Sequence, residues 1–178
     1  MAQATIEAHR EGAEIYTGDA LCQEKSLELL REFHLPLGLL PLEDVQEVGY
    51  HQESGFVWLR QKKARTHNFR KASRLVSYAT DVTAFVEDRR MRRVTGVKSK
   101  ELLIWVTISE FFLDPKDFSK VTFKTPAGLS RTFPASAFDL DADSPAAKYK
   151  QPDAAPAAAP APEVPPPAAA APAAADAN

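Results

Sequence analysis

The sequence has 178 residues, a net charge of −2 and one cysteine. A single cysteine excludes a disulfide within the chain and a thiolate metal site, and it indicates a reducing compartment. No apolar run approaches the roughly 18 residues of a membrane-spanning helix, and the N-terminus lacks the apolar segment of a signal peptide. We therefore expect a cytoplasmic protein without a transmembrane segment.

Composition divides the chain into three parts. Residues 151–178 contain 14 Ala and 8 Pro, too little apolar surface to offset the entropy of ordering. We predict a disordered tail over 146–178, a single folded domain over 19–145 and an N-terminal arm over 1–18. The remaining 150 or so residues are enough for one domain with its own core.

The first predicted element is a helix from about Asp19 to Phe33, followed by an apolar linker. One face of the helix carries Cys22, Ser26, Leu29, Leu30 and Phe33. We expect Asp19 to be the N-cap, Cys22 to be a buried, inert thiol, and the helix to end before Pro36. The linker reads FHLPLGLLPLEDV, residues 33–45, and we expect it to lie on a sheet and close one end of the core.

Strand patterns follow the linker. LEDVQEVGY and FVWLRQ form a predicted hairpin, and RLVSYATDVTAFVED alternates over fifteen residues. A turn is expected near Gly96, then one strand over ELLIWVTISEFFL that is covered on both faces, and a last hairpin around PAGL. The fold class we predict is mainly β: an antiparallel meander curled into a roll or barrel, with one N-terminal α-helix packed on it.

The sequence has no recognisable catalytic motif and no sign of a cofactor. GLSRT lacks the second glycine of a nucleophile elbow, so we interpret Ser130 as a turn residue. Neighbouring strands could bring His51 and His67 together near Glu53, but no specific motif indicates a catalytic triad there. Neither a metal-ligand spacing nor a glycine-rich phosphate loop occurs. We expect no cofactor and no metal.

Charge is distributed unevenly along the chain. Residues 1–50 carry a net charge of −7, whereas residues 60–100 carry +10. The basic side chains form two clusters near predicted strand ends: Lys62, Lys63 and Arg65, then Arg89, Arg90, Arg92, Arg93 and Lys98. We predict that hairpin tips gather them on one rim that binds an anionic surface, although a pair of merely solvated turns would show the same pattern. Nucleic acid is not expected, because no recognised module occurs.

Three long segments of the chain follow a family pattern: EGAEIYTGDALCQEKSLELLREFHLPLGLLPLEDVQEVGYHQESGFVWLRQKK, RLVSYATDVTAFVEDRRMRRVTGVKSKELLIWVTISEF and FKTPAGLSRTFPASAF. In this order they resemble the plant "domain of unknown function 538" family. His34 departs from the pattern, where the family is expected to have Gly at the helix end. The resemblance implies a mainly-β roll with a helix, a likeness to bactericidal/permeability-increasing lipid-binding proteins, a proposed esterase-like action on chlorophyll, and a role in plant stress or development. It supplies no catalytic residues.

Three functions remain open from the sequence. The first is a non-catalytic protein that binds a lipid or an anionic membrane surface peripherally, with apolar contacts from Leu37, Leu39, Leu40 and Trp105. The second is an esterase-like hydrolase acting on a hydrophobic ester, with Ser130, His51 or His67 in its site. The third is a scaffold whose basic face binds an acidic protein.

Overall fold

A computed structural model describes residues 2–140, 144 and 147; the predicted tail lies outside them apart from Ala147. The elements in chain order are α1 (Ala2–Ala8), β1 (Glu14–Thr17), α2 (Asp19–Glu32), β2 (Val45–His51), β3 (Phe56–Gln61), β4 (Arg65–Phe69), the 3-10 helix η1 (Arg70–Ala72), β5 (Arg74–Glu87), β6 (Arg90–Glu101), β7 (Ile104–Thr107), β8 (Glu110–Asp114), β9 (Asp117–Lys124), β10 (Ser130–Pro134) and the 3-10 helix η2 (Ala135–Phe138).

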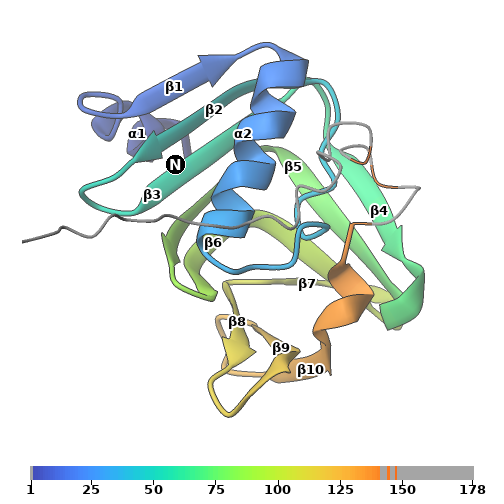
Figure 1. The fold of residues 1–178 in the computed structure, drawn as a ribbon. Helices are drawn as coiled ribbons and strands as arrows, with labels where there is room; N and C mark the ends of the chain where they lie inside the picture. Colours follow the sequence, from blue (N-terminus) through green and yellow to red (C-terminus); the bar gives the residue numbers. More distant parts are fainter. Residues whose placement is uncertain (1, 141–143, 145–146, 148–178) are drawn as a thin grey trace, which may run out of the picture.

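All ten strands belong to one antiparallel sheet (Figure 1). The hydrogen-bonded order is β1-β2-β3-β5-β6-β8-β9-β10, with β4 paired to β5 and β7 paired to β6 beside this path. β5 and β6 are the longest strands, so each exchanges one partner for another along its length. The predicted fold class is confirmed. The described strands form a curled sheet that stays open between β1 and β10, rather than a closed barrel.

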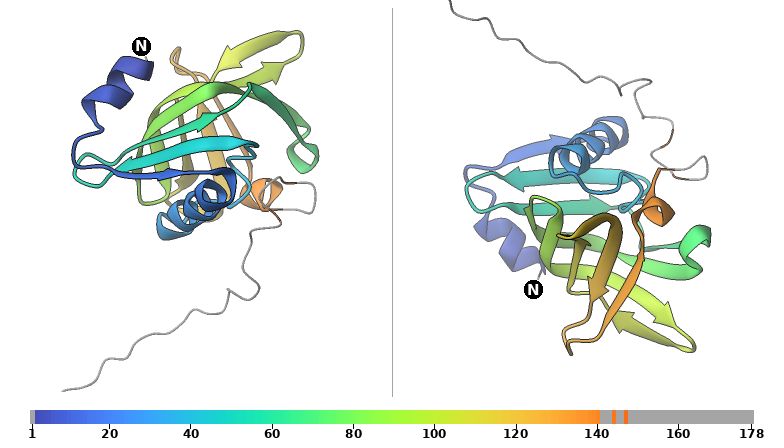
Figure 2. Two further views of the ribbon diagram at one scale, coloured as in Figure 1. Left: turned by 90° about the horizontal axis from the view of Figure 1, so that it is seen from above. Right: turned by 60° about the horizontal axis from the view of Figure 1, so that its bottom comes forward.

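The main core lies inside the curl, where α2 packs on β1 and β2 (Figures 1 and 2). The linker after α2 contributes four buried leucines to it: Leu35, Leu39, Leu40 and Leu42. The Tyr78 hydroxyl donates to the Leu39 carbonyl oxygen at 2.9 Å, and the Gly38 N–H donates to the Phe138 carbonyl oxygen at 2.8 Å. These bonds join the linker to β5 and η2. The linker closes the core, as the sequence predicted.

The N-terminal end of α2 differs from the prediction in its capping residue. The N-cap residue is Gly18, not Asp19, and Asp19 begins the helix. The Asp19 carboxylate instead accepts a hydrogen bond from the backbone N–H of Val45 at 2.8 Å, which ties the helix start to β2. At the other end His34 has φ 55°, and the Leu35 N–H donates to the Leu30 carbonyl. His34 therefore adopts the left-handed conformation that ends a helix, which Gly would adopt at lower cost.

A second, smaller core lies on the outer face of the sheet, under α1. Figure 2 (left) shows α1 and α2 on opposite sides of the sheet. Ile6 packs there against Phe56 and Trp58, whose side chains alternate with those facing the main core. Gly49 makes room for the indole, because a Cβ at Gly49 would lie 2.0 Å from Trp58 Cζ2.

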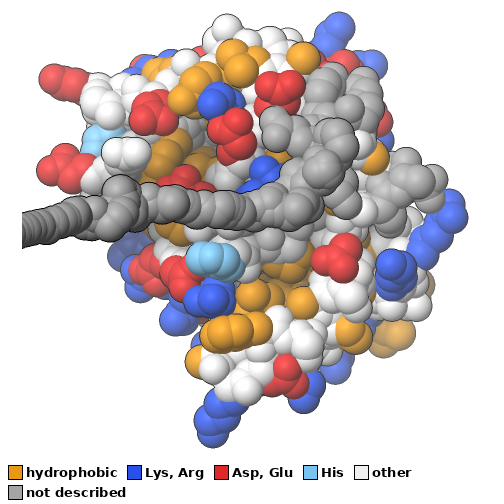
Figure 3. All heavy atoms as spheres, viewed as in Figure 1, with side chains coloured by type: hydrophobic (Ala, Val, Ile, Leu, Met, Phe, Trp, Pro, Cys, Tyr) orange, Lys and Arg blue, Asp and Glu red, His pale blue; other side chains and the backbone are white. Residues whose placement is uncertain are grey.

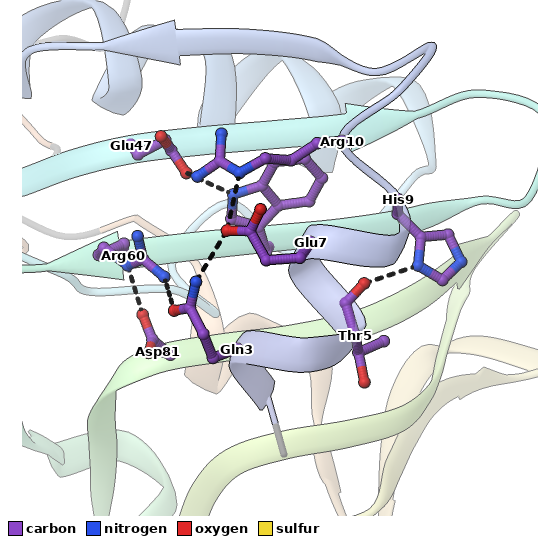
Figure 4. Close-up of polar contacts among 9 residues, drawn as sticks. Gln3, Thr5, Glu7, His9, Arg10, Glu47, Arg60 and Asp81 are labelled. Atoms are coloured by element: carbon purple, nitrogen blue, oxygen red, sulfur yellow. Dashed lines mark hydrogen bonds and ion pairs between the residues drawn. The ribbon is translucent and has the colours of Figure 1, made fainter.

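Polar contacts surround this second core (Figure 4). The Glu47 carboxylate accepts from Arg10 Nη2 at 2.7 Å and from Trp58 Nε1 at 2.8 Å. Arg60 donates to Asp81 at 2.8 Å and to the Gln3 side-chain oxygen at 2.6 Å. The predicted N-terminal arm therefore contains a helix, α1, that covers the outer face of β3 and β5, and a strand, β1, that pairs with β2 at the edge of the sheet. Neither element was predicted from the sequence.

Two strand predictions in the middle of the chain were wrong. The predicted turn near Gly96 is absent, and β6 runs without a break through this residue, which has φ 83° opposite a register shift. A Cβ there would lie 2.4 Å from the Asp81 carbonyl oxygen, so the glycine permits close strand approach. The single strand predicted over 101–113 is instead a tight β6–β7 hairpin followed by β8, and Leu102 at the hairpin turn has φ 56°.

Candidate functional site

A pocket of about 600 Å³ lies between the β6–β7 hairpin and the β9–β10 hairpin. Both hairpins project from the end of the molecule that comes forward in Figure 2 (right). Six apolar side chains form most of its inner wall: Val76, Val106, Ile108, Phe123, Phe133 and Phe138. Its volume lies within the range of about 300–1,000 Å³ that small-molecule sites occupy.

The floor of the pocket is a cluster of three phenylalanines from three elements. Phe123 of β9 lies 5.0 Å from Phe138 of η2 and 5.9 Å from Phe133 of β10, between ring centroids. Such tilted and edge-on rings at this spacing form a firm apolar surface. Because η2 and the linker are joined by the Gly38 hydrogen bond, the floor is anchored to the main core.

The mouth of the pocket is bordered by exposed leucines. Leu102 and Leu103, at the β6–β7 turn, are 91% and 90% exposed, and Leu129 of the β9–β10 turn is 68% exposed. Ile104 is also exposed, and Trp105, next to it, lies with its ring 5.8 Å from Lys100 Nζ. We call Leu102, Leu103 and Leu129 the leucine lip. Exposed apolar side chains that gather at one place on a surface are typical of binding sites.

Three charged residues also line the pocket: Arg74 of β5, Glu101 of β6 and Arg131 of β10. Arg74 Nη1 is 3.6 Å from Glu101 Oε2, and Arg131 Nη2 is 3.7 Å from the same oxygen. Both distances are too long for a hydrogen bond. One carboxylate thus lies between two guanidinium groups, and the three side chains have a net charge of +1.

The predicted apolar contact residues do not line this pocket. Leu39 and Leu40 are buried in the main core, and Leu37 is half-buried against it. Trp105 is 42% exposed and lies between two pocket residues on β7, so its side chain projects from the opposite face of that strand. Leu102 and Leu103 of the leucine lip were missed because the sequence pattern placed them in a strand covered on both faces.

The two basic clusters are not brought together on one rim. Arg65 pairs with Tyr78, whereas Arg90 pairs with Glu87, nine residues further along the same strand. Nine extended residues span roughly 30 Å. Lys98 pairs with Ser77 and so lies near Arg65 rather than near Arg90. The prediction of a common rim was therefore wrong, although binding of an anionic surface by these residues stays a prediction.

Most of these arginines have acidic or aromatic neighbours. Arg65 is paired with Glu43, Arg89 with Asp88, Arg90 with Glu110 and Arg92 with Glu87, while the Arg93 guanidinium lies 5.7 Å from the Phe85 ring. Lys62, Lys63 and Lys98 are exposed. Figure 3 shows acidic and basic side chains interspersed over one face of the molecule. Local pairing reduces the net positive field of both clusters.

Outside the pocket, burial or neighbouring side chains shift the pKa values of Cys22, Tyr78 and Asp88. Burial raises the pKa of the Cys22 thiol to about 11, and it raises the pKa of Tyr78 as well. The hydrogen bond from His34, together with the charge of Arg89, lowers the pKa of Asp88. Because Cys22 is fully buried and its thiol is held neutral, it has the properties of an inert core residue.

The pocket contains a serine but neither of the two histidines that were considered as its catalytic base. Ser130 lines the pocket, but His51 is the last residue of β2, with Nδ1 2.9 Å from Ser54 Oγ. His67 lies edge-on to Phe69, with ring centroids 4.7 Å apart, and it too lies outside the pocket lining. Within the described part of the chain, no group of three His, Cys, Asp or Glu side chains could hold a metal ion.

Comparison with known proteins identifies the family and nothing further. The model of the family described as "Protein of unknown function, DUF538" matches residues 26–139, which include every residue of the pocket lining. No curated protein and no solved structure matches the chain. None of the described helices is long and apolar enough to span a bilayer. The match covers more than half of the sequence, and the chain belongs to the DUF538 family.

Proposed function

We propose that this protein binds a lipid, without catalysis, by taking a single apolar chain into the pocket between the β6–β7 and β9–β10 hairpins. The observation that carries the proposal is the pocket itself: about 600 Å³, with a phenylalanine floor and apolar walls. Core voids in proteins are normally filled by side chains, so a hollow of this size and lining fits an apolar ligand.

The leucine lip supports a membrane as the source of the ligand. Leu102 and Leu103 stand at the tip of a hairpin, almost fully exposed, beside the pocket mouth. Apolar side chains at such a tip are stabilised when they enter the acyl region of a bilayer, at about 25 cal/mol per Å² of buried apolar surface. Trp105 and Lys100 just behind the tip suit the bilayer interface. The protein would then bind membranes peripherally and withdraw a lipid into the pocket.

The esterase-like alternative has one observation in its favour, the place of Ser130 in the pocket wall. A serine needs an adjacent base, and neither His51 nor His67 lines the pocket. A scaffold for an acidic protein draws on the basic clusters, whose arginines are largely paired within the chain. We therefore place non-catalytic lipid binding first.

Calorimetric titration of the full chain with 1-decanol tests the proposal. Val106→Trp fills the pocket, whereas Thr107→Trp adds the same side chain to the neighbouring exposed position, outside the pocket lining. We expect wild type and Thr107→Trp to bind alike and Val106→Trp to bind at least about tenfold more weakly, a loss of about 1.4 kcal/mol. Absence of binding by the wild type, or equal binding by Val106→Trp, would overturn the proposal. Hydrolysis of p-nitrophenyl decanoate that disappears in Ser130→Ala would favour the esterase instead.

A further inference from the structure

We infer that the ligand has an anionic headgroup, a carboxylate or a phosphate monoester, which the guanidinium groups of Arg74 and Arg131 bind at the pocket mouth. This inference rests on the proposed function and names the chemical class of the lipid. It assigns a role to a charged site in a wall that is otherwise largely apolar.

The first observation is that Arg74 has unused hydrogen-bonding capacity. Its Nε is buried without an acceptor among the residues that the structure describes. Its nearest ion-pair contact, Nη1 to Glu101, is 3.6 Å long, which is beyond hydrogen-bonding distance. Arg65 also has a buried Nε of this kind, but its Nη1 donates to Glu43. A guanidinium carries five donors, so the Arg74 site is short of acceptor oxygens.

The second observation is that Arg74 and Arg131 come from opposite walls of the pocket. Arg74 begins β5, whose partner strand β6 ends at Glu101, and Arg131 lies on β10 across the mouth. Both point a guanidinium nitrogen at the same Glu101 oxygen, from 3.6 Å and 3.7 Å. Guanidinium groups that converge from two sides suit an anion with two or more oxygens.

The third observation concerns charge. Two guanidinium groups share a single carboxylate, so these three side chains have an excess of one positive charge that favours an anionic headgroup. The Arg74 guanidinium also lies 5.4 Å from the Phe133 ring, which fixes it beside the apolar floor. An amphiphile with its chain on the phenylalanine floor would therefore bring its headgroup to the two arginines.

The test compares ligands with one chain and different headgroups. Decanoate, decyl phosphate and 1-decanol are titrated into the full chain by calorimetry. We expect at least one anion to bind about ten- to a hundredfold more tightly than 1-decanol, the range typical of hydrogen bonds to charged groups. The stronger of the two anions identifies the headgroup class. Equal affinity for all three ligands would overturn this inference and leave the proposed function intact, whereas failure of all three to bind would overturn both.

Variants locate the headgroup. Arg74→Gln combined with Arg131→Gln should remove the preference for anions, so that decanoate and decyl phosphate bind no more tightly than 1-decanol to this variant. Arg92→Gln with Arg93→Gln, an equal change of charge outside the pocket lining, should keep it. Arg131 is 66% exposed, so Arg131→Gln alone folds even if the double variant does not, and it should weaken anion binding severalfold. Glu101→Gln should strengthen anion binding, because it removes the competing carboxylate. A preference for anions that survives Arg131→Gln unchanged contradicts the assignment.

Discussion

At Gly49 the lack of a side chain decides how Trp58 lies on the outer face of the sheet. We predict that Gly49→Ala lowers the free energy of unfolding by about 1–3 kcal/mol, the usual cost of overpacking, since the new Cβ would lie 2.0 Å from the indole ring. Urea unfolding followed by circular dichroism measures this. In a Trp58→Phe background, which lacks the clashing atoms, the same substitution should cost clearly less. An equal cost in both backgrounds would exclude the clash as the cause.

Cys22 provides a second test at this scale. The thiol is fully buried, its Sγ lies 3.3 Å from the Tyr16 carbonyl oxygen, and burial raises its pKa to about 11. We expect Ellman's reagent to leave the native protein unlabelled at pH 8 and to label one thiol after unfolding in urea. The raised pKa also means that the thiol stabilises the fold up to about pH 9 and that this contribution declines as pH rises toward 11. Rapid labelling of the native protein would show that the site opens.

Among the elements, α1 has the most specific role in the fold, because it covers Trp58. Ile6→Asp should detach α1 by placing a charge in the second core, while the main core remains folded. In a Trp105→Phe background Trp58 is the sole tryptophan, so detachment should appear as a red shift of its fluorescence. Ala4→Asp, an equal charge on the exposed side of α1, should leave the spectrum unchanged. A red shift in both variants, or in neither, would contradict this role for α1.

Elements with a regular apolar period were predicted well. α2, the β2–β3 hairpin, β5 and the β9–β10 hairpin all follow from spacing, since each buries one face against the core. The segment 101–113 was mispredicted because its turn is made by Leu102 and Leu103, and Leu102 takes a left-handed conformation without any glycine or asparagine to indicate it. The pattern predicted Leu102 and Leu103 to be core residues, yet they are the most exposed apolar residues of the pocket mouth. The pocket forms where two hairpins that are separate in sequence meet. The hydrophobic periodicity of a single strand does not indicate such contacts.

For the whole molecule, two surfaces compete as the membrane contact: the leucine lip and the basic clusters. We expect Leu102→Asp with Leu103→Asp to abolish flotation with phosphatidylcholine vesicles that contain phosphatidylserine, because the tip can no longer enter the bilayer. Replacing Arg89, Arg90, Arg92 and Arg93 by Glu should weaken flotation only at low salt, where long-range attraction contributes. Full binding by the lip variant, with loss in the arginine variant, would restore the basic clusters as the principal contact.

In the proposed mode of binding, an apolar chain lies between the β6–β7 and β9–β10 hairpins and not against the linker. Methyl NMR spectra of the full chain, recorded with and without 1-decanol, test it most directly, since both regions are rich in methyl groups. We predict that resonances of Val106, Ile108 and Leu129 shift with ligand, while those of Leu39 and Leu40 in the core do not. Shifts confined to the linker leucines, or no shifts at all, would rule out binding in this pocket.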